Sequence, residues 1–304
     1  MNQSIFDKVI SVVIPTYNRY DCLADTLEAL RRQVGCGFEV VVVDQTPLRR
    51  RRELEATGFA LHWFLQEEPS ASAARNLALR EAHGEVVLFL DDDVIIDDPS
   101  FLMKHLRHYE NPRVVGVAGA APHIGQAMNL RRHRFFREGG LGWAYFPSNQ
   151  CCQAWLRVGR SNNLSVRRDA AIACGGMDEQ FEKGAHREEA DFGLRLTRDG
   201  RRILYDPFAA LVHIGNAEGG IRSWQQGEKI KALHHMVGDL YLMFRQIPLS
   251  QRLEYLALSL RYFVFPRGIR TPVKLWTVAL DRYGKAWRIA ARKAKEGPKF
   301  IVIP

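Results

Sequence analysis

The stretch that most constrains the fold is residues 86–98, VVLFLDDDVIIDD, in which an apolar run stops in three consecutive aspartates. An apolar, partly β-branched run preceded by Gly84 predicts a fully buried strand, and such strands belong to parallel sheets covered on both faces. Asp91, Asp92 and Asp93 would then lie at the carboxyl edge of the sheet, where open α/β sheets bind ligands. Adjacent carboxylates repel one another, so the run is either a solvated acidic turn or a site for a divalent cation that prefers oxygen ligands.

The composition indicates a globular chain without a membrane span. Its 304 residues, 46% of them hydrophobic, allow one large or two modest domains. The five cysteines form no CxxC pair, which favours a reducing cytoplasm. No apolar stretch approaches the roughly 20 residues that cross a bilayer, and the first residues lack the pattern of a signal peptide. We therefore expect a protein that is soluble or bound to a membrane surface.

The charge is positive and concentrated near the carboxyl end. The net charge is +9, from 43 basic and 34 acidic residues, and residues 267–299 hold ten lysines or arginines against Asp281 and Glu296. This balance favours anionic partners such as nucleotides, anionic lipids or nucleic acid, without choosing among them.

Strand and helix patterns alternate along the first hundred or so residues. Apolar runs at 9–15, 38–43 and 61–65 precede the strand that ends in the aspartates, and helical patterns lie between them, one capped by Asp21 and ending near Gly35 and another over 73–82. Short connections between such patterns are typical of βαβ units and a parallel sheet.

Polar residues follow three of these strands, so their side chains should meet. Thr16 and Asn18 follow Pro15, Asp44 follows the second strand, and the aspartates follow the fourth. Parallel strands bring their carboxyl ends to one crevice. There is no GxGxxG or GxxxxGK after the first strand, so phosphates here would need a metal and basic side chains, and Arg75 is well placed to serve.

The segments VVIPTYNR, VVVVD, ARN and LDDD, in this order, resemble the nucleotide-sugar-binding half of a family 2 glycosyltransferase. The resemblance covers roughly residues 9–215. It implies the α/β GT-A fold, with a Rossmann-like, mostly parallel sheet flanked by helices, and a helical C-terminal extension follows that pattern here. We accordingly expect a catalytic domain over 1–220, with a nucleotide-sugar-binding half at 9–120 and an acceptor half at 121–220, and an extension over 221–304.

The resemblance also implies roles for single residues. Thr16 and Asp44 would contact the nucleotide base, and Arg75 would lie beside the base and phosphates. Asp91 and Asp93 match the DxD element, whose first acid reaches the ribose side and whose second holds a Mn²⁺ or Mg²⁺ that bridges the two phosphates. The remaining residues predicted to bind the nucleotide sugar are Pro15, Asn18 and Asp92. The sequence departs from the family at Gln45 and Thr46, where an acidic-Gly-Ser turn is frequent, and at Ser72 and Ala73, where a glycine is usual.

The segment EEADFGLR, residues 188–195, carries the candidates for the catalytic base. Its carboxylates could simply cap a helix, because the helix dipole stabilises acids in the first turn. Sugar transfer with inversion, however, needs a carboxylate to accept the proton of the acceptor hydroxyl. The segment resembles the family's ED-x-D-L/F-x-x-R, in which the second acid is the usual base. This implies Glu189 as the base, where the family commonly has aspartate, with Asp191 as the second candidate.

His213 follows the apolar run ALV and matches the family's late histidine, which completes the metal site in several members. The alternative is a structural histidine at a strand end. Residues 121–157, rich in arginine, glycine and aromatic residues, are expected to form a loop and short-helix region that faces the acceptor.

The last eighty residues leave the family pattern. Helices are expected over 224–245 and 272–295, and residues 249–265 are apolar and aromatic with scattered arginines. In the last helix one face holds apolar side chains and the other is mostly basic. Such a helix fits the surface of an anionic membrane or an ordinary packed helix with a solvated face. The predicted apolar face consists of Trp276, Leu280, Tyr283, Trp287 and Ala290.

These features predict a metal-dependent inverting glycosyltransferase. It would move a sugar from a nucleotide-diphosphate sugar, with UDP-sugars favoured, to a saccharide or lipid-linked hydroxyl acceptor, in assembly of a cell-surface polysaccharide or glycolipid. It would be cytoplasmic and peripheral at the inner face of the cell membrane. The alternatives are a catalytically silent scaffold that binds nucleotide sugar or membrane, and a sugar-phosphate nucleotidyltransferase, which would want a Gly-rich loop after the first strand. Nucleic-acid binding has only the charge in its favour.

Overall fold

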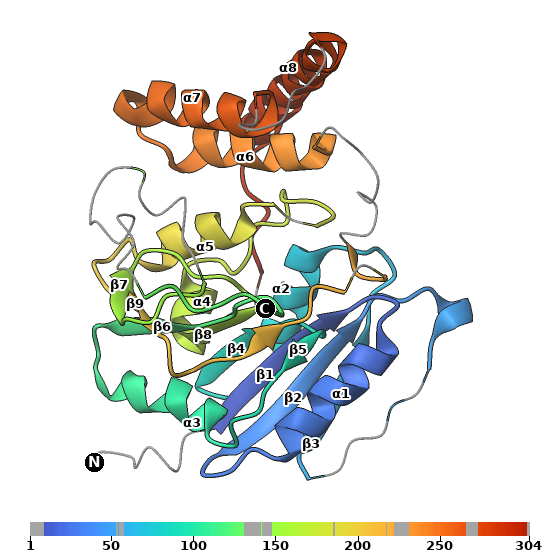
Figure 1. Ribbon diagram of the computed structural model, residues 1–304, viewed down its shortest axis with the longest axis vertical. Coiled ribbons are helices and arrows are strands. Elements are labelled where there is room, and N and C mark those ends of the chain that lie inside the picture. The colour runs from blue at the N-terminus through green and yellow to red at the C-terminus, as the bar shows by residue number, and fades with distance from the viewer. Residues whose placement is uncertain are drawn as a thin grey trace.

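The computed structural model describes residues 9–52, 54, 58–130, 141, 148–184, 186–216, 218–221, 231–265 and 273–302. An eight-stranded sheet lies at its centre, in the order β3-β2-β1-β4-β8-β6-β9-β7 (Figure 1). The strands are β1 (Val9–Thr16), β2 (Gly37–Asp44), β3 (Ala60–Leu65), β4 (Val86–Leu90), β6 (Val114–Gly119), β7 (Ala154–Leu156), β8 (Asn163–Arg167) and β9 (Arg202–Asp206). Only β8 and β7 run against their neighbours. This confirms the predicted mostly parallel α/β sheet.

Apolar side chains on both faces of the sheet are buried, which explains the continuous apolar runs of the strands. On one face, α1 (Tyr20–Arg31) and α3 (Phe101–Leu106) pack against the sheet. On the other face lie α2 (Ala71–Glu81), α4 (Arg168–Ala173) and α5 (Glu188–Leu196). The sheet is therefore the middle layer of three, and the short 3-10 helices Leu48–Arg50, Arg107–Glu110 and Leu249–Gln251 lie in connections.

The two helix starts of the first hundred residues differ from the expectation in detail. Asp21 does not cap α1, because Arg19 holds the cap position, with no side-chain cap bond, and Asp21 lies in the first turn. Helix α2 begins earlier than the predicted Ala73. Its cap is Ser70, whose Oγ accepts a hydrogen bond of 3.3 Å from the Ala73 amide.

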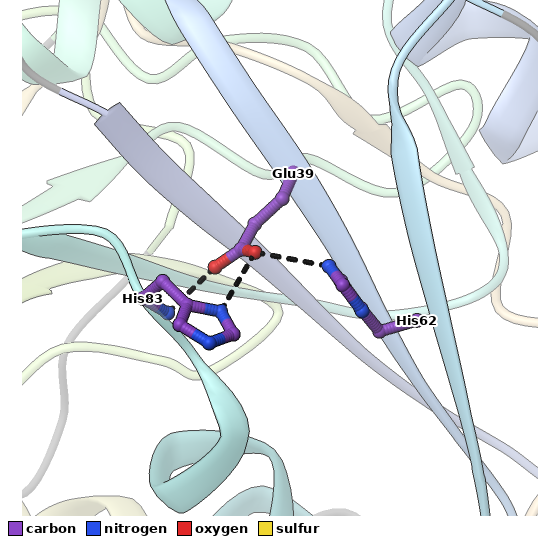
Figure 2. A group of neighbouring side chains, drawn as sticks. All are labelled: Glu39, His62 and His83. Carbon is purple, nitrogen blue, oxygen red and sulfur yellow. Dashed lines mark hydrogen bonds and ion pairs between the residues drawn. The ribbon is translucent and has the colours of Figure 1, made fainter.

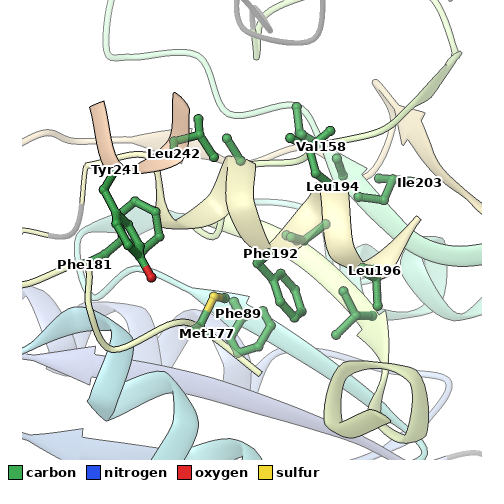
Figure 3. Packing of buried hydrophobic residues seen from close by; sticks show 14 of the residues in the cluster. Phe89, Val158, Met177, Phe181, Phe192, Leu194, Leu196, Ile203, Tyr241 and Leu242 are labelled. Atoms are coloured by element: carbon green, nitrogen blue, oxygen red, sulfur yellow. The ribbon is translucent and has the colours of Figure 1, made fainter. Parts of the chain in front are cut away.

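Helix α5 lies between the sheet and the C-terminal helices. Figure 3 shows Phe192 of α5 lying against Phe89 of β4, with ring centroids 6.0 Å apart and perpendicular planes. Phe181, just before α5, packs in the same way on Tyr241, with centroids 5.1 Å apart. One continuous apolar core thus reaches from the sheet through α5 into the extension. Of the segment expected to face the acceptor, residues 131–140 and 142–147 lie outside the described residues.

The extension consists of α6 (Leu233–Gln246), α7 (Arg252–Phe263) and α8 (Val273–Glu296), and it covers α5 at the end of the molecule remote from α1 and α3 (Figure 1). The helix expected over 224–245 begins at Leu233 in the described part, and 224–230 lies outside it. Helix α7 forms from the apolar stretch with scattered arginines. No helix in the described residues is long and apolar enough to cross a membrane.

The predicted apolar face of α8 is divided between core and solvent. Tyr283 and Ala290 are buried, together with Ala279 and Ala286, whereas the side chains of Leu280 and Trp287 lie on the flank, where the two residues are 46% and 38% exposed. Core packing therefore accounts for the Tyr283 side of the helix. The flank is partly exposed, although the centroid of the Trp287 ring lies 5.0 Å from that of Phe244.

Candidate active site

A cavity of about 660 Å³ opens beside the carboxyl ends of β1 and β4 and the start of α5. Parallel strands bring their carboxyl ends together there, as the sequence predicted. The predicted site residues that line it are Pro15, Thr16, Arg75, Asp91, Asp92, Asp93, Glu189 and His213.

The middle aspartate of the acidic run is held by the protein. Thr16 Oγ1 donates a 2.7 Å hydrogen bond to Asp92 Oδ2, and Thr26 Oγ1 of α1 donates one of 3.0 Å to the Asp92 carbonyl. Burial raises the pKa of Asp92 to about 7, although the Arg19 guanidinium acts in the opposite direction. Asp92 thus fixes the turn at the edge of the cavity, which all three aspartates line.

Asp91, Asp93 and His213 form a cluster whose ligand atoms all lie within 4.8 Å of one another. The short pairing of β10 (Val212–His213) with β5 (Val94–Ile95) sets the histidine beside the aspartates. His213 Nε2 is 3.5 Å from Asp91 Oδ2 and 3.2 Å from Asp93 Oδ1. Burial acts to lower the pKa of His213, but these two carboxylates outweigh it and raise the pKa to about 9.

This cluster fits a divalent cation. Within the described part of the chain, Asp93 Oδ1 is buried and accepts no hydrogen bond of regular geometry, so its contact there is the ion pair with His213, which a cation could replace. Carboxylate oxygens with one imidazole nitrogen suit Mn²⁺ or Mg²⁺. A cation bound there would take the place of the proton on His213.

Arg19 is a component of the site that the sequence reasoning missed. Its Nη1 lies 3.3 Å from Asp92 Oδ1 and 3.0 Å from Asp93 Oδ2. Its other nitrogens donate to the carbonyls of Asn216 and Glu218, at 2.6 and 3.0 Å. The guanidinium therefore compensates the negative charge of the acidic turn and holds the loop after β10 against this turn. The one available signal was its place in TYNR, directly after the first strand.

Arg75 joins the acidic turn to α5. Its guanidinium forms an ion pair with Glu188, and its Nη2 lies 3.6 Å from Asp91 Oδ1. Ser72 Oγ also donates a hydrogen bond to Glu188. Glu188 is buried, so these contacts supply the compensation that a buried carboxylate requires. The serine that replaces the family's glycine thus has a partner 116 residues away.

The two candidate bases lie in different surroundings. Glu189 is half-buried and lines the cavity, and its Oε1 accepts hydrogen bonds from the amide and the hydroxyl of Ser161, at 3.1 and 2.9 Å. Asp191 is buried, bonds Arg195 at 2.8 Å and accepts a 2.5 Å bond from Gln246 of α6. Asp191 is not among the described residues that line the cavity.

Asn18 and Asp44 also lie outside the described lining of the cavity. Asp44 accepts hydrogen bonds from the Tyr20 hydroxyl at 2.7 Å and the Thr46 amide at 2.9 Å. The Asn18 amide donates to Thr46 Oγ1 at 2.9 Å. Gln45 lines the cavity instead, and its Oε1 accepts the Ser70 amide at 2.7 Å. Base contact by Asp44 stays a prediction.

The extension contributes to the cavity as well. His235 of α6 and Tyr262 of α7 line it, together with Arg160 and His186. The family pattern ends before these helices, so the sequence held no signal for their participation.

Comparison with known proteins agrees with this architecture. The model of glycosyl transferase family 2 matches residues 11–196, more than half of the chain. The O-antigen biosynthesis protein RfbC of Myxococcus xanthus is 27% identical over 224 residues, which are 67% of this chain and 17% of that protein. The chain therefore spans about a sixth of the length of this relative.

Two solved structures share the fold at low identity. The mannosyltransferase PcManGT of Pyrobaculum calidifontis, in complex with GDP-Man and Mn²⁺, is 18% identical with a TM-score of 0.54, covering 94% of this chain and 74% of its own. S. aureus TarS 1-349, in complex with UDP-GlcNAc, is 15% identical with a TM-score of 0.52, covering 95% and 92%. At these identities the likeness concerns the fold alone.

Proposed function

We propose that this chain, which belongs to glycosyl transferase family 2 and has the GT-A fold, transfers a sugar from a nucleotide-diphosphate sugar to a hydroxyl acceptor, with inversion at the anomeric carbon. One observation carries the proposal: a single cavity collects the aspartate run, His213, Arg75 and Glu189. This combination offers a cation site for a diphosphate and a carboxylate for proton transfer, which are the two requirements of the reaction.

The donor lies along the carboxyl ends of β1 and β4 in this proposal. Asp91, Asp93 and His213 hold Mn²⁺ or Mg²⁺, which would neutralise charge on the leaving diphosphate. Thr16 and Arg19 keep the acidic turn in place through Asp92. The nucleotide sugars in the solved relatives, GDP-Man and UDP-GlcNAc, support a donor of this class, and we propose a UDP-sugar.

Glu189 is the proposed base. It accepts the proton of the acceptor hydroxyl while that oxygen bonds to the anomeric carbon and the bond from this carbon to the diphosphate oxygen breaks, so no covalent sugar-enzyme intermediate forms. The two bonds from Ser161 hold Oε1, and we assign the proton transfer to Oε2. Glu188 is already paired with Arg75, so we assign the proton transfer to its neighbour Glu189.

The acceptor enters from the side of the extension. We propose a saccharide or lipid-linked acceptor in assembly of a cell-surface polysaccharide or glycolipid, supported by the O-antigen biosynthesis relative. We also propose that the extension rests on the anionic inner face of the cell membrane. Leu280 and Trp287 on the partly exposed flank of α8, with exposed Lys285 and Arg288 on the solvent side of the same helix, support this, because apolar and basic side chains together favour such surfaces.

Replacement of the second DxD acid tests the proposal. Asp93→Ala should abolish metal-dependent donor turnover and leave the fold intact, measured as nucleotide release from UDP- and GDP-sugars with Mn²⁺ or EDTA, with circular dichroism as the control for folding. Turnover at the wild-type rate would refute the role of Asp93. A folded wild-type protein that turns over no donor would favour the scaffold alternative.

A further inference from the structure

A second cluster of metal-ligating side chains lies away from the cavity. It consists of Glu39 on β2, His62 on β3 and His83 in the turn after α2 (Figure 2). Glu39 Oε2 is 3.2 Å from His62 Nε2 and 3.1 Å from His83 Nδ1. One ligand atom from each residue thus lies within 4.8 Å of the other two.

This cluster is at the opposite edge of the sheet from the candidate active site. Glu39 pairs with Ser11 near the start of β1, whereas Asp44 pairs with Thr16 at the strand ends. Five residues of strand separate the two levels, a distance of roughly 17 Å. The two groups of ligands are therefore independent of each other.

The carboxylate of Glu39 is held in one orientation by a serine hydroxyl and a backbone amide. Its Oε1 accepts hydrogen bonds from Ser11 Oγ at 2.5 Å and from the His83 amide at 2.6 Å. Ser11 Oγ in turn accepts the Gly84 amide at 2.8 Å. The Glu39 side chain is only 9% exposed. These bonds engage Oε1 and direct Oε2 toward both imidazoles, which is how ligating carboxylates are oriented in metal sites.

The two distances from Glu39 to the imidazoles match a zinc ion. Zinc binds imidazole nitrogen and carboxylate oxygen at about 2.0 to 2.2 Å in tetrahedral geometry, which places two ligand atoms about 3.3 Å apart. The observed oxygen-to-nitrogen distances of 3.2 and 3.1 Å are close to that value. We propose that Glu39, His62 and His83 bind Zn²⁺, with water at the fourth position.

Ligand chemistry distinguishes this site from the aspartate cluster. Two imidazoles and one carboxylate favour zinc, whereas two carboxylates and one imidazole accept the harder Mn²⁺ or Mg²⁺. The zinc ion joins the edge strand β3 to β2 and to the turn that ends α2. Since α2 carries Ser72 and Arg75 in its first turns, the ion stabilises the part of the sheet that supports them.

Calorimetric titration of the full, tag-free chain with ZnCl₂ at pH 7.5 tests this proposal. His213→Gln serves as the background, so that the aspartate cluster lacks its imidazole. This variant should bind one zinc ion per chain. Adding His62→Gln or His83→Gln should weaken zinc binding at least about 100-fold, whereas adding His234→Gln, a histidine outside both clusters, should not change it.

Two further readouts accompany the titration. Saturating zinc should raise the melting temperature by roughly 4 °C in the background variant, and not in the variants that lack His62 or His83. Co²⁺ should give the strong visible absorption of a tetrahedral ion only when both histidines are present. Zinc affinity that is unchanged in both variants, or no zinc binding by a folded background variant, would overturn the proposal.

Discussion

The three carboxylates in the first turn of α5 have three different partners. Glu188 pairs with Arg75 of α2, Glu189 accepts bonds from Ser161, and Asp191 pairs with Arg195 one turn along its own helix. Helix geometry alone places all of them near the helix start. The contacts that distinguish them include Arg75, Ser161 and Gln246, which are distant in sequence, and this is why the spacing left Glu189 and Asp191 as alternatives.

Glu189→Gln should lower kcat about 10³-fold, because glutamine cannot accept the proton of the acceptor. The affinity for UDP should stay within a factor of two, since the donor is bound by other residues. Steady-state transfer assays with titration of UDP measure both quantities.

Asp191→Asn is the matched control. It should destabilise the protein through the loss of its ion pair with Arg195, and the folded fraction should keep a kcat close to that of the wild type. A large loss of kcat in Asp191→Asn together with normal transfer by Glu189→Gln would reverse the assignment of the base.

Part of the site could be predicted from sequence at this scale. Asp91, Asp93 and His213 follow apolar strands, so topology brings them together. Arg19 could not be recognised as their partner, because its bonds to the carbonyls of Asn216 and Glu218 connect segments almost 200 residues apart. Asp44 also lies at the carboxyl end of a parallel strand, yet its carboxylate accepts hydrogen bonds from Tyr20 and Thr46.

At the scale of elements, α5 depends on a close approach of two backbones. A Cβ on Gly193 would lie 2.8 Å from the Arg157 carbonyl oxygen and 2.8 Å from Val158 Cα. The segment after Val158 leads to Ser161, which orients Glu189. The glycine thus sets the distance between the helix that carries Glu189, the proposed base, and the loop that holds its side chain.

Gly193→Ala should destabilise the protein by about 1 to 3 kcal/mol, because backbone atoms must move to admit the methyl group. Gly284→Ala in α8, where a Cβ would meet nothing within 4 Å, should instead stabilise it by up to about 1 kcal/mol through helix propensity. Urea unfolding of both variants measures the two changes. Equal effects of the same sign would contradict the close approach at Gly193.

The predicted strands rest on β-branched apolar runs, and β1, β2 and β4 all form from them. The start of α1 differs from the expectation because Arg19, not Asp21, holds the cap position, and the Arg19 side chain is bonded to the acidic turn. The sequence of α7 shows no clear helical period of apolar residues, because Leu253 is 82% exposed and Ser259 is buried against polar partners.

At the scale of the molecule, the C-terminal helices are tied to the start of α5 through a buried charge. Asp239 of α6 accepts a 2.8 Å bond from Arg187, directly before α5, and further bonds from Tyr255 and Ser259 of α7. The chain end returns to the core, where the Ile301 amide donates to the Gly175 carbonyl at 3.0 Å. The extension is thus part of the support of α5.

The flank of α8 allows a test of the proposed membrane contact. Leu280→Gln with Trp287→Gln should weaken binding to vesicles that contain phosphatidylglycerol by about tenfold, because both side chains lose apolar area. Val278→Gln is the matched control, since Val278 is also exposed on α8 but lies off this flank. Sedimentation with vesicles measures the binding. Equal binding by the wild-type protein, the double variant and the control variant would exclude a contact through this flank.

The central claim is that the aspartate run binds a nucleotide diphosphate through a metal. Calorimetric titration of the wild-type protein and of Asp93→Ala with UDP, GDP and dTDP, each with Mn²⁺ and with EDTA, tests it most directly. We predict binding of one nucleotide, UDP, to the wild-type protein only with Mn²⁺, and no binding to Asp93→Ala. Equal affinity in EDTA, or no binding of any nucleotide by the folded wild-type protein, would contradict the claim.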